Sequence, residues 1–126
     1  MTDAHEALVA ILREGRLLVV HRVPEDGDYW HLVGGGVEPG ETAAAAAARE
    51  AFEEVGLAVQ PADAGFAYDY DRDVRVHVDC FFVEVRPDWE PRLNWEHDGF
   101  RWVDAAEAAE LLHWPEPREL AARLLR

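Results

Sequence analysis

Short apolar runs separated by polar breaks dominate the first third of the chain. Leu8 to Leu12 and Leu17 to His21 are two such runs, and the polar, glycine-containing stretch Arg13 to Arg16 lies between them. This order predicts a β-hairpin. After a polar loop at Pro24 to Asp28, the apolar stretch Tyr29 to Val33 predicts a third strand.

One long helix is predicted in the middle of the chain. The three glycines at 34–36 are expected to break regular structure. Thr42 or Glu41 is suited to cap a helix that begins there, because short polar side chains accept hydrogen bonds from the free backbone amides of the first turn. An alanine-rich segment then continues to about Val55, and Gly56 follows as a C-terminal cap.

Alternating apolar positions return after this helix. Phe66 to Tyr70 and Val74 to Val85 predict two strands with a turn at Asp71 to Asp73. The remaining expected elements are a loop at Pro87 to Gly99, a strand at Phe100 to Val103, and helices at Asp104 to Leu112 and Pro115 to Arg126. Strands with one internal helix and a helical end predict an α/β fold with a mixed sheet between helical layers, formed as a single domain over residues 1–126.

Carboxylates are concentrated on the predicted long helix. At 100° per residue, the expected core-facing stripe consists of Ala45, Ala48, Phe52 and Val55. The opposite side carries Glu50, Glu53 and Glu54 at i, i+3, i+4 spacing. Arg49 can pair with Glu53, which leaves two carboxylates without a basic partner. Carboxylate oxygens bind Mg²⁺, although a solvated acidic face explains the helix alone equally well.

The glycines at 34–36 add a second chemical feature. Glycine lets the backbone approach a ligand closely, and successive backbone amides can form a concavity that binds an anion. The glycines lead directly into the carboxylate helix. A phosphate-binding turn beside a metal-binding face is the arrangement that metal-assisted phosphoryl chemistry requires.

The segment Gly35 to Leu57 resembles the Nudix box, whose spaced positions it fills with Gly35, Glu41, Arg49, Glu50, Glu53, Glu54, Gly56 and Leu57. Two positions depart from the usual pattern: Ala51 replaces a bulkier aliphatic residue, and Val33 replaces the proline that often precedes the glycines. Neither change removes a catalytic group. The resemblance implies the Nudix fold, an α/β/α sandwich with a mixed sheet, and a hydrolase acting on acid anhydrides.

The resemblance also implies roles for individual residues. Glu50, Glu53 and Glu54 would bind Mg²⁺, with Mn²⁺ as an alternative ion, and Glu50 or Glu53 would act as the general base. Further metal ligands would be the carbonyl of Gly34 and the late-loop carboxylate of Glu96, for which an exposed loop residue is the competing interpretation. Structural positions in the motif would be Glu41, Arg49 and Gly56.

Candidate substrate-binding residues are Arg22, Trp30, Gly35 and Gly36. Arginine offers a forked donor to phosphate, although a surface or strand-end role explains Arg22 nearly as well. Trp30, Trp89 and Trp95 are expected near or in loops where a purine could stack, with packing as the favoured alternative for any single one of them. Trp102 and Trp114 are expected to pack in the core and against the last helix. His97 is interpreted as an ordinary surface histidine.

The C-terminal part resembles the ends of two Nudix groups. Glu96-His97, Phe100-Arg101-Trp102 and Trp114-Pro115 are similar to segments of bacterial nucleoside triphosphate pyrophosphohydrolases, including those acting on dATP or dihydroneopterin triphosphate. The second group comprises diadenosine polyphosphate hydrolases. The favoured interpretation is hydrolysis of a triphosphate to a monophosphate and pyrophosphate. ADP-ribose or nucleotide-sugar hydrolysis and a non-catalytic nucleotide-binding module remain alternatives.

The net charge and the cysteine content narrow the range of expected binding partners and cellular locations. The net charge of −14, with 12 arginines and no lysine, opposes nucleic-acid binding and also repels a nucleotide triphosphate at long range. The resemblance nevertheless implies a nucleotide-like small molecule as the expected partner. No apolar stretch is long enough to span a membrane. The lone Cys80, expected to be a core thiol, favours a cytoplasmic location, and the expected assembly is a monomer or a homodimer.

Overall fold

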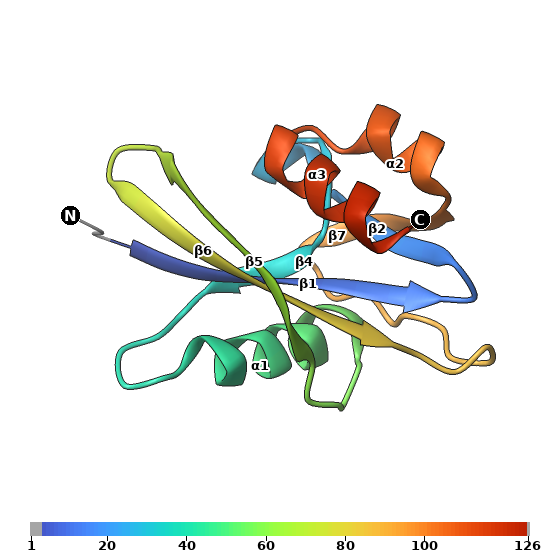
Figure 1. Cartoon of the computed structure of the whole chain (residues 1–126), viewed down its shortest axis with the longest axis horizontal. Helices are drawn as coiled ribbons and strands as arrows, with labels where there is room; N and C mark the ends of the chain where they lie inside the picture. Colours follow the sequence, from blue (N-terminus) through green and yellow to red (C-terminus); the bar gives the residue numbers. More distant parts are fainter. Residues whose placement is uncertain (1–3, 126) are drawn as a thin grey trace.

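A computed structural model describes residues 4–125, and within that range a mixed sheet lies between helices on both faces (Figure 1). The elements are β1 (Ala4–Arg13), β2 (Arg16–Arg22), β3 (Trp30–His31), β4 (Val33–Gly36), α1 (Ala43–Val55), β5 (Ala62–Asp71), β6 (Arg75–Glu84), β7 (His97–Val103), α2 (Ala105–Leu111) and α3 (Pro115–Leu124). The predicted α/β class with a mixed sheet is confirmed. Arg126, the expected last helical residue, lies outside the described range.

Strand β1 is the centre of the sheet. The strand order is β3-β2-β1-β6-β5, β4 also pairs with β1, and β7 also pairs with β2. β1 runs parallel to β6 and antiparallel to β2 and β4. β2 pairs with β1 at Leu12, whereas β4 pairs with its first half, where Gly36 lies opposite Glu6. The two partners on this edge of β1 therefore diverge, and the glycine strand borders the space between them.

The core consists of two clusters separated by the sheet. Alternate residues of β1 point to opposite faces, so Leu8 packs in the cluster that holds Leu112 and Leu120 of the C-terminal part. Val9 packs in the other cluster, which holds Val55 of α1. Figure 1 shows the result, with α1 on one side of the sheet and α2 and α3 on the other.

The ends of α1 agree with the sequence prediction, but its rotation does not. Thr42 caps the N-terminus and Gly56 ends the helix in the left-handed conformation. The predicted core stripe is wrong apart from Val55, because Phe52 is 60% exposed and Ala45 is exposed. The buried residues are instead Ala46, Ala47, Glu50, Ala51, Glu54 and Val55. Small residues and two carboxylates face the sheet because β4 offers glycine backbone there.

Several boundaries also differ from the prediction. The glycines at 34–36 do not break regular structure; they belong to β4 and pair with β1. The predicted strand at Tyr29 to Val33 is divided between β3 and β4, and β5 begins at Ala62, before the predicted Phe66. β7 begins at His97, inside the predicted loop. Within residues 4–125, no helix is long and apolar enough to cross a membrane.

Candidate active site

A cavity of about 690 Å³ is lined by residues of the strands β1 to β5, of α1 and of the start of α3, together with loop residues. Its wall combines glycine backbone, carboxylates, arginines and aromatic rings. The predicted site residues that line it are Arg22, Gly34, Gly35, Gly36, Glu50 and Glu96. Glu53 and Trp30 are not part of the wall, and Glu54 lies buried behind it.

Glu54 is a buried carboxyl group without a counter-charge at hydrogen-bond distance. Its side chain is 1% exposed, and among the described residues neither carboxylate oxygen makes a hydrogen bond of good geometry, although the Glu50 carboxyl and the Gly34 backbone lie close to it. The His97 imidazole lies farther away, with Nε2 3.7 Å from Oε1. Burial, followed by the neighbouring Glu50, raises the pKa of Glu54 well above its usual range. The metal-free protein therefore holds this group in its neutral form near pH 7.

Glu50 lies beside Gly35 because that position has no side chain. A Cβ atom at Gly35 would lie 2.7 Å from Oε1 of Glu50, closer than real Cβ contacts allow. Gly34 is needed for a different reason: a Cβ there would lie 2.3 Å from the carbonyl oxygen of Ala7 on β1. The two glycines thus bring β1, β4 and the carboxylate face of α1 into close contact.

Arg49 fixes the geometry between the glycine strand and α1. Its guanidinium donates two hydrogen bonds to Glu41, at 2.8 and 2.9 Å, and one to the carbonyl of Gly36 at 2.9 Å. It also contacts Glu50 at 2.9 Å and Glu53 at 3.4 Å, so the predicted Arg49–Glu53 pair is present. The hydrogen bonds from Arg49 lower the pKa of Glu41 to about 2. This carboxylate therefore stays ionised even in acid.

The three carboxylates of α1 do not form the single solvent-facing patch expected from their spacing. Glu50 and Glu54 are buried, whereas Glu53 is exposed on the side of the helix. At 100° per residue, Glu50 and Glu54 lie about 40° apart on the helical circumference, and both face the sheet. Glu53 lies about 60° from Glu50 on the other side, and about 100° from Glu54. Only Glu50 of the two general-base candidates reaches the cavity.

Arg22 and Glu96 form a second polar group on the wall. Arg22 Nη1 donates to Glu96 Oε2 at 3.2 Å, and Asn94 Nδ2 donates to Glu96 Oε1 at 3.2 Å. The interpretation of His97 as a surface residue is wrong, because it is 5% exposed. Burial, and then the charge of Arg22, lower the pKa of both His97 and His31 to about 4. Both imidazoles are therefore neutral at pH 7.

The aromatic part of the wall differs from the expectation. Tyr29, Tyr68, Tyr70 and Trp114 line the cavity. Trp114 was expected only to pack against the last helix. Trp30 instead packs against the core, Trp89 contacts Trp102 edge-on, and Trp95 is 78% exposed. The alternation of β5 could have identified Tyr68 and Tyr70, since residues two apart on a strand share a face.

The donor set fits a hard divalent cation. Oxygen ligands from carboxylates and backbone carbonyls suit Mg²⁺, and both oxygens of Glu54 lack a hydrogen-bond partner within residues 4–125. Burial of a bare carboxylate is unfavourable unless a cation or hydrogen bonds compensate it. The Glu50–Glu54 pair therefore supplies carboxylates that could hold such a cation.

The residues of the Nudix-box segment thus lie together beside an arginine-bearing cavity, as the sequence resemblance predicts. The NUDIX domain family model matches residues 3–124, and the chain belongs to this family. Nudix enzymes generally use divalent metal ions.

Similar proteins support this assignment. A putative 8-oxo-dGTP diphosphatase 2 from Mycobacterium tuberculosis is 37% identical over an alignment 128 residues long. The alignment covers 93% of this chain and 84% of that protein. The structure of the Escherichia coli dihydroneopterin triphosphate pyrophosphohydrolase has a TM-score of 0.86 and 27% identity, and the match covers 96% of this chain and 94% of that one. An octanoyltransferase from Myxococcus xanthus is 40% identical over 115 residues, but this chain spans only 32% of its length.

Proposed function

We propose that this protein is a Mg²⁺-dependent pyrophosphohydrolase that converts a nucleoside triphosphate, or a similar triphosphate, to a monophosphate and pyrophosphate. The observation that carries the proposal is the buried Glu54, whose oxygens have no hydrogen-bond partner among the described residues, next to Glu50 at the cavity. Such a pair is costly to the fold and is explained by a cation that binds it.

The metal ligands in this proposal are Glu50, Glu53 and Glu54, with the carbonyl of Gly34 and the carboxylate of Glu96. Mg²⁺ bound there would neutralise phosphate charge and lower the pKa of an attacking water. Arg49 holds Glu50 in place, and Arg22 presents a guanidinium on the cavity wall that suits a phosphate oxygen.

Glu50 is favoured over Glu53 as the general base. It lines the cavity, whereas Glu53 is exposed beside it. A general base must lie within hydrogen-bond reach of the proton that it accepts. Glu50 would take the proton from the attacking water, and the P–O bond to the pyrophosphate leaving group would break.

The cavity suits a flat heterocycle linked to phosphates. Its volume of about 690 Å³ lies within the usual range of ligand sites. Tyr70 and Trp114 offer ring surfaces for stacking, and Arg22 and Arg72 offer positive charge. The names of two relatives, an 8-oxo-dGTP diphosphatase and a dihydroneopterin triphosphate pyrophosphohydrolase, indicate bicyclic bases carried on a triphosphate.

The test is a substrate panel assayed with and without Mg²⁺, in which phosphate and pyrophosphate release are followed separately. The panel contains the standard nucleoside triphosphates, 8-oxo-dGTP, dihydroneopterin triphosphate, a diadenosine polyphosphate and ADP-ribose. We expect Mg²⁺-dependent pyrophosphate release from one of the triphosphates. Turnover of ADP-ribose or a diadenosine polyphosphate alone would overturn the proposed substrate class, and binding without turnover would indicate a non-catalytic module.

Variants separate the roles of the carboxylates. Glu54→Gln and Glu50→Gln should each reduce kcat at least about 100-fold, whereas Glu110→Gln, an exposed carboxylate on α2, should retain the activity. A larger loss of kcat in Glu53→Gln than in Glu50→Gln would reverse the assignment of the base. Full turnover by Glu54→Gln would contradict the metal site.

A further inference from the structure

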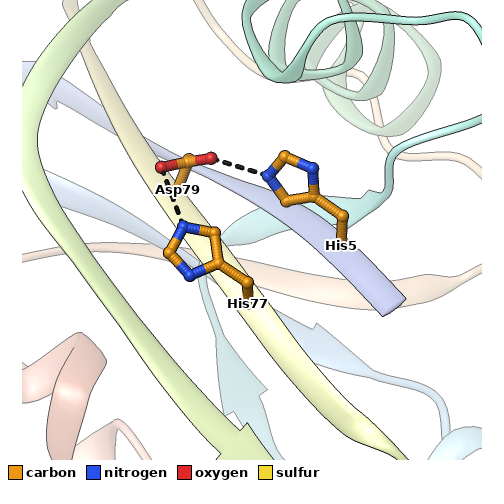
Figure 2. A group of neighbouring side chains, drawn as sticks. All are labelled: His5, His77 and Asp79. Carbon is orange, nitrogen blue, oxygen red and sulfur yellow. Dashed lines mark hydrogen bonds and ion pairs between the residues drawn. The ribbon is translucent and has the colours of Figure 1, made fainter. Parts of the chain in front are cut away.

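A second group of potential metal ligands lies on β1 and β6. Figure 2 shows His5 of β1 and His77 of β6 on either side of the Asp79 carboxylate. The two strands are parallel neighbours, and His5 pairs with His77 in their register. The backbone pairing therefore holds the two imidazoles together without the help of a loop.

This cluster is separate from the candidate active site. Glu6 and Tyr70 line the cavity, but neither histidine nor Asp79 does. Side chains alternate between the two faces of a strand, so His5 lies on the opposite face of β1 from Glu6. The cluster consequently belongs to a different surface of the sheet from the aromatic wall of the cavity.

The three side chains converge through atoms that commonly bind metals. Nε2 of His5 lies 2.6 Å from Asp79 Oδ2, and Nε2 of His77 lies 3.3 Å from Asp79 Oδ1. The three ligand atoms all lie within 4.8 Å of one another. The exposed fractions of these side chains are 38% for His5, 36% for His77 and 35% for Asp79, so an ion can reach them from solvent.

A fourth residue orients the ligands. Asp69 of β5 contacts Nδ1 of His77, and it lies opposite His77 in the β5–β6 register. Nδ1 of His77 therefore donates to Asp69, which leaves Nε2 to face Asp79. Metal-binding histidines commonly have such a carboxylate on their other ring nitrogen, because it fixes the ring orientation and strengthens the ligand.

We propose that His5, His77 and Asp79 form a binding site for a divalent transition-metal ion of the Zn²⁺ type, separate from the Mg²⁺ site. Two imidazoles and one carboxylate match the donor preference of Zn²⁺, with water completing the coordination. Mg²⁺ prefers a shell of oxygen ligands and competes poorly for imidazole nitrogen. An ion at this site would link β1 to β6. Because Val37 N donates to His5 O at 2.8 Å, it would also stabilise the segment that follows the glycine strand.

The experiment is a calorimetric titration of the full chain with Zn²⁺ in a large excess of Mg²⁺, which occupies the carboxylate site. We expect one equivalent of Zn²⁺ to bind and to raise the melting temperature. His77→Ala should weaken binding at least tenfold, and Asp69→Asn should weaken it about 10- to 100-fold. His113→Ala, which removes an exposed histidine elsewhere, and Glu54→Gln should leave Zn²⁺ affinity unchanged.

The visible spectrum of Co²⁺ bound to the unmodified protein supplies a measurement that does not depend on any variant. Nitrogen ligation should give intense d–d bands in the presence of Mg²⁺, and Zn²⁺ should remove them. Absence of stoichiometric Zn²⁺ binding, or a Co²⁺ spectrum like that of the aqueous ion, would show that the cluster is only a hydrogen-bonded network. An unchanged Zn²⁺ affinity in His77→Ala would equally overturn the site. Neither result would bear on the Glu50–Glu54 site.

Discussion

At the scale of single residues, the three glycines of β4 have different surroundings. An alanine substitution should therefore affect stability and activity differently at each position. Gly34→Ala would place a Cβ 2.3 Å from a backbone oxygen of β1 and should cost about 1–3 kcal/mol of stability. Gly35→Ala meets the end of the flexible Glu50 side chain, so it should preserve the fold but lower kcat/KM about 100-fold by displacing that carboxylate. Gly36→Ala meets no atom within 4 Å among the described residues and should change stability by less than about 0.5 kcal/mol. Chemical denaturation and steady-state kinetics of the three variants test this order, and an active, stable Gly34→Ala would contradict the close contact of β4 with β1.

In the absence of a bound metal ion, Glu54 should make the stability of the protein depend on pH. Because burial raises its folded pKa above the ordinary value of 4.5, the unfolded chain loses this proton at a pH where the folded protein keeps it. Stability should therefore fall as pH rises above that ordinary value, by up to about 1.4 kcal/mol per pH unit. From about pH 7 to about pH 8 the buried His31 and His97 stay neutral, because their pKa values lie near 4. The hydrogen bond to Asp69 raises the pKa of the partly exposed His77, which also titrates in this range, so the effect of Glu54 is the difference between wild type and a variant without this carboxyl group.

The measurement compares urea denaturation of wild type and Glu54→Gln in the presence of a chelator. Wild type should lose more stability across this range than Glu54→Gln, which should be more stable and keep only the shallower pH dependence that comes from His77. Added Mg²⁺ should remove the decline in wild type, because ionised Glu54 then has a cation. Identical pH profiles of the two proteins would mean that Glu54 is already ionised in the metal-free fold.

At the scale of elements, Arg49 joins the glycine strand to α1. Lysine can replace the charge of Arg49 but not its forked guanidinium group. That group donates hydrogen bonds to Glu41, Glu50 and the carbonyl of Gly36 at the same time. Arg49→Lys should therefore cost about 1–3 kcal/mol and lower kcat by releasing Glu50. Arg86→Lys is the matched control, because Arg86 is exposed and pairs only with its near neighbour Asp88 among the contacts described. Equal stability of the two variants would show that the fork does not hold α1 in place.

The same element shows what the sequence can predict. The ends of α1 follow from local chemistry: Thr42 accepts a hydrogen bond from the backbone of Ala45, and Gly56 adopts a positive φ. Its rotation could not be predicted from hydrophobicity, because the largest apolar residue, Phe52, is exposed while two carboxylates are buried. That arrangement depends on glycines that pair with β1, a contact between distant segments. Spacing within the Nudix box identified the carboxylates, but only the tertiary structure distinguishes the buried Glu50 and Glu54 from the exposed Glu53.

The wall of the cavity was less predictable for the same reason. Tyr68 lies on β5 and Trp114 immediately precedes α3, two segments that come together only when both pack in the same core cluster. No local pattern relates a strand in the middle of the chain to the first turn of its last helix. The aromatic residues of the cavity wall are therefore the part of the proposed site that depends most on the fold.

At the scale of the whole molecule, the charge of −14 opposes the approach of a polyanionic substrate. The side chains of the cavity wall do not make the entrance positive, because among the described residues carboxylates outnumber guanidinium groups there. The carboxylates are those of Glu6, Glu50, Asp71, Glu96 and Glu116, and the guanidinium groups are those of Arg22 and Arg72. Added monovalent salt screens charges beyond a Debye length, about 10 Å at 0.1 M. With Mg²⁺ held in excess, kcat/KM for the triphosphate should therefore rise about two- to fivefold as ionic strength increases from low values.

A series of initial rates in increasing NaCl measures this dependence, and a substrate with fewer phosphates, such as ADP-ribose where it is turned over, provides the comparison. The rise should be smaller for that substrate because it carries less charge. A fall of kcat/KM with salt would mean that bound cations, together with Arg22 and Arg72, already make the entrance attractive to anions. In that case the acidic surface would act at too great a distance to affect association, and the positive charge at the cavity would control it.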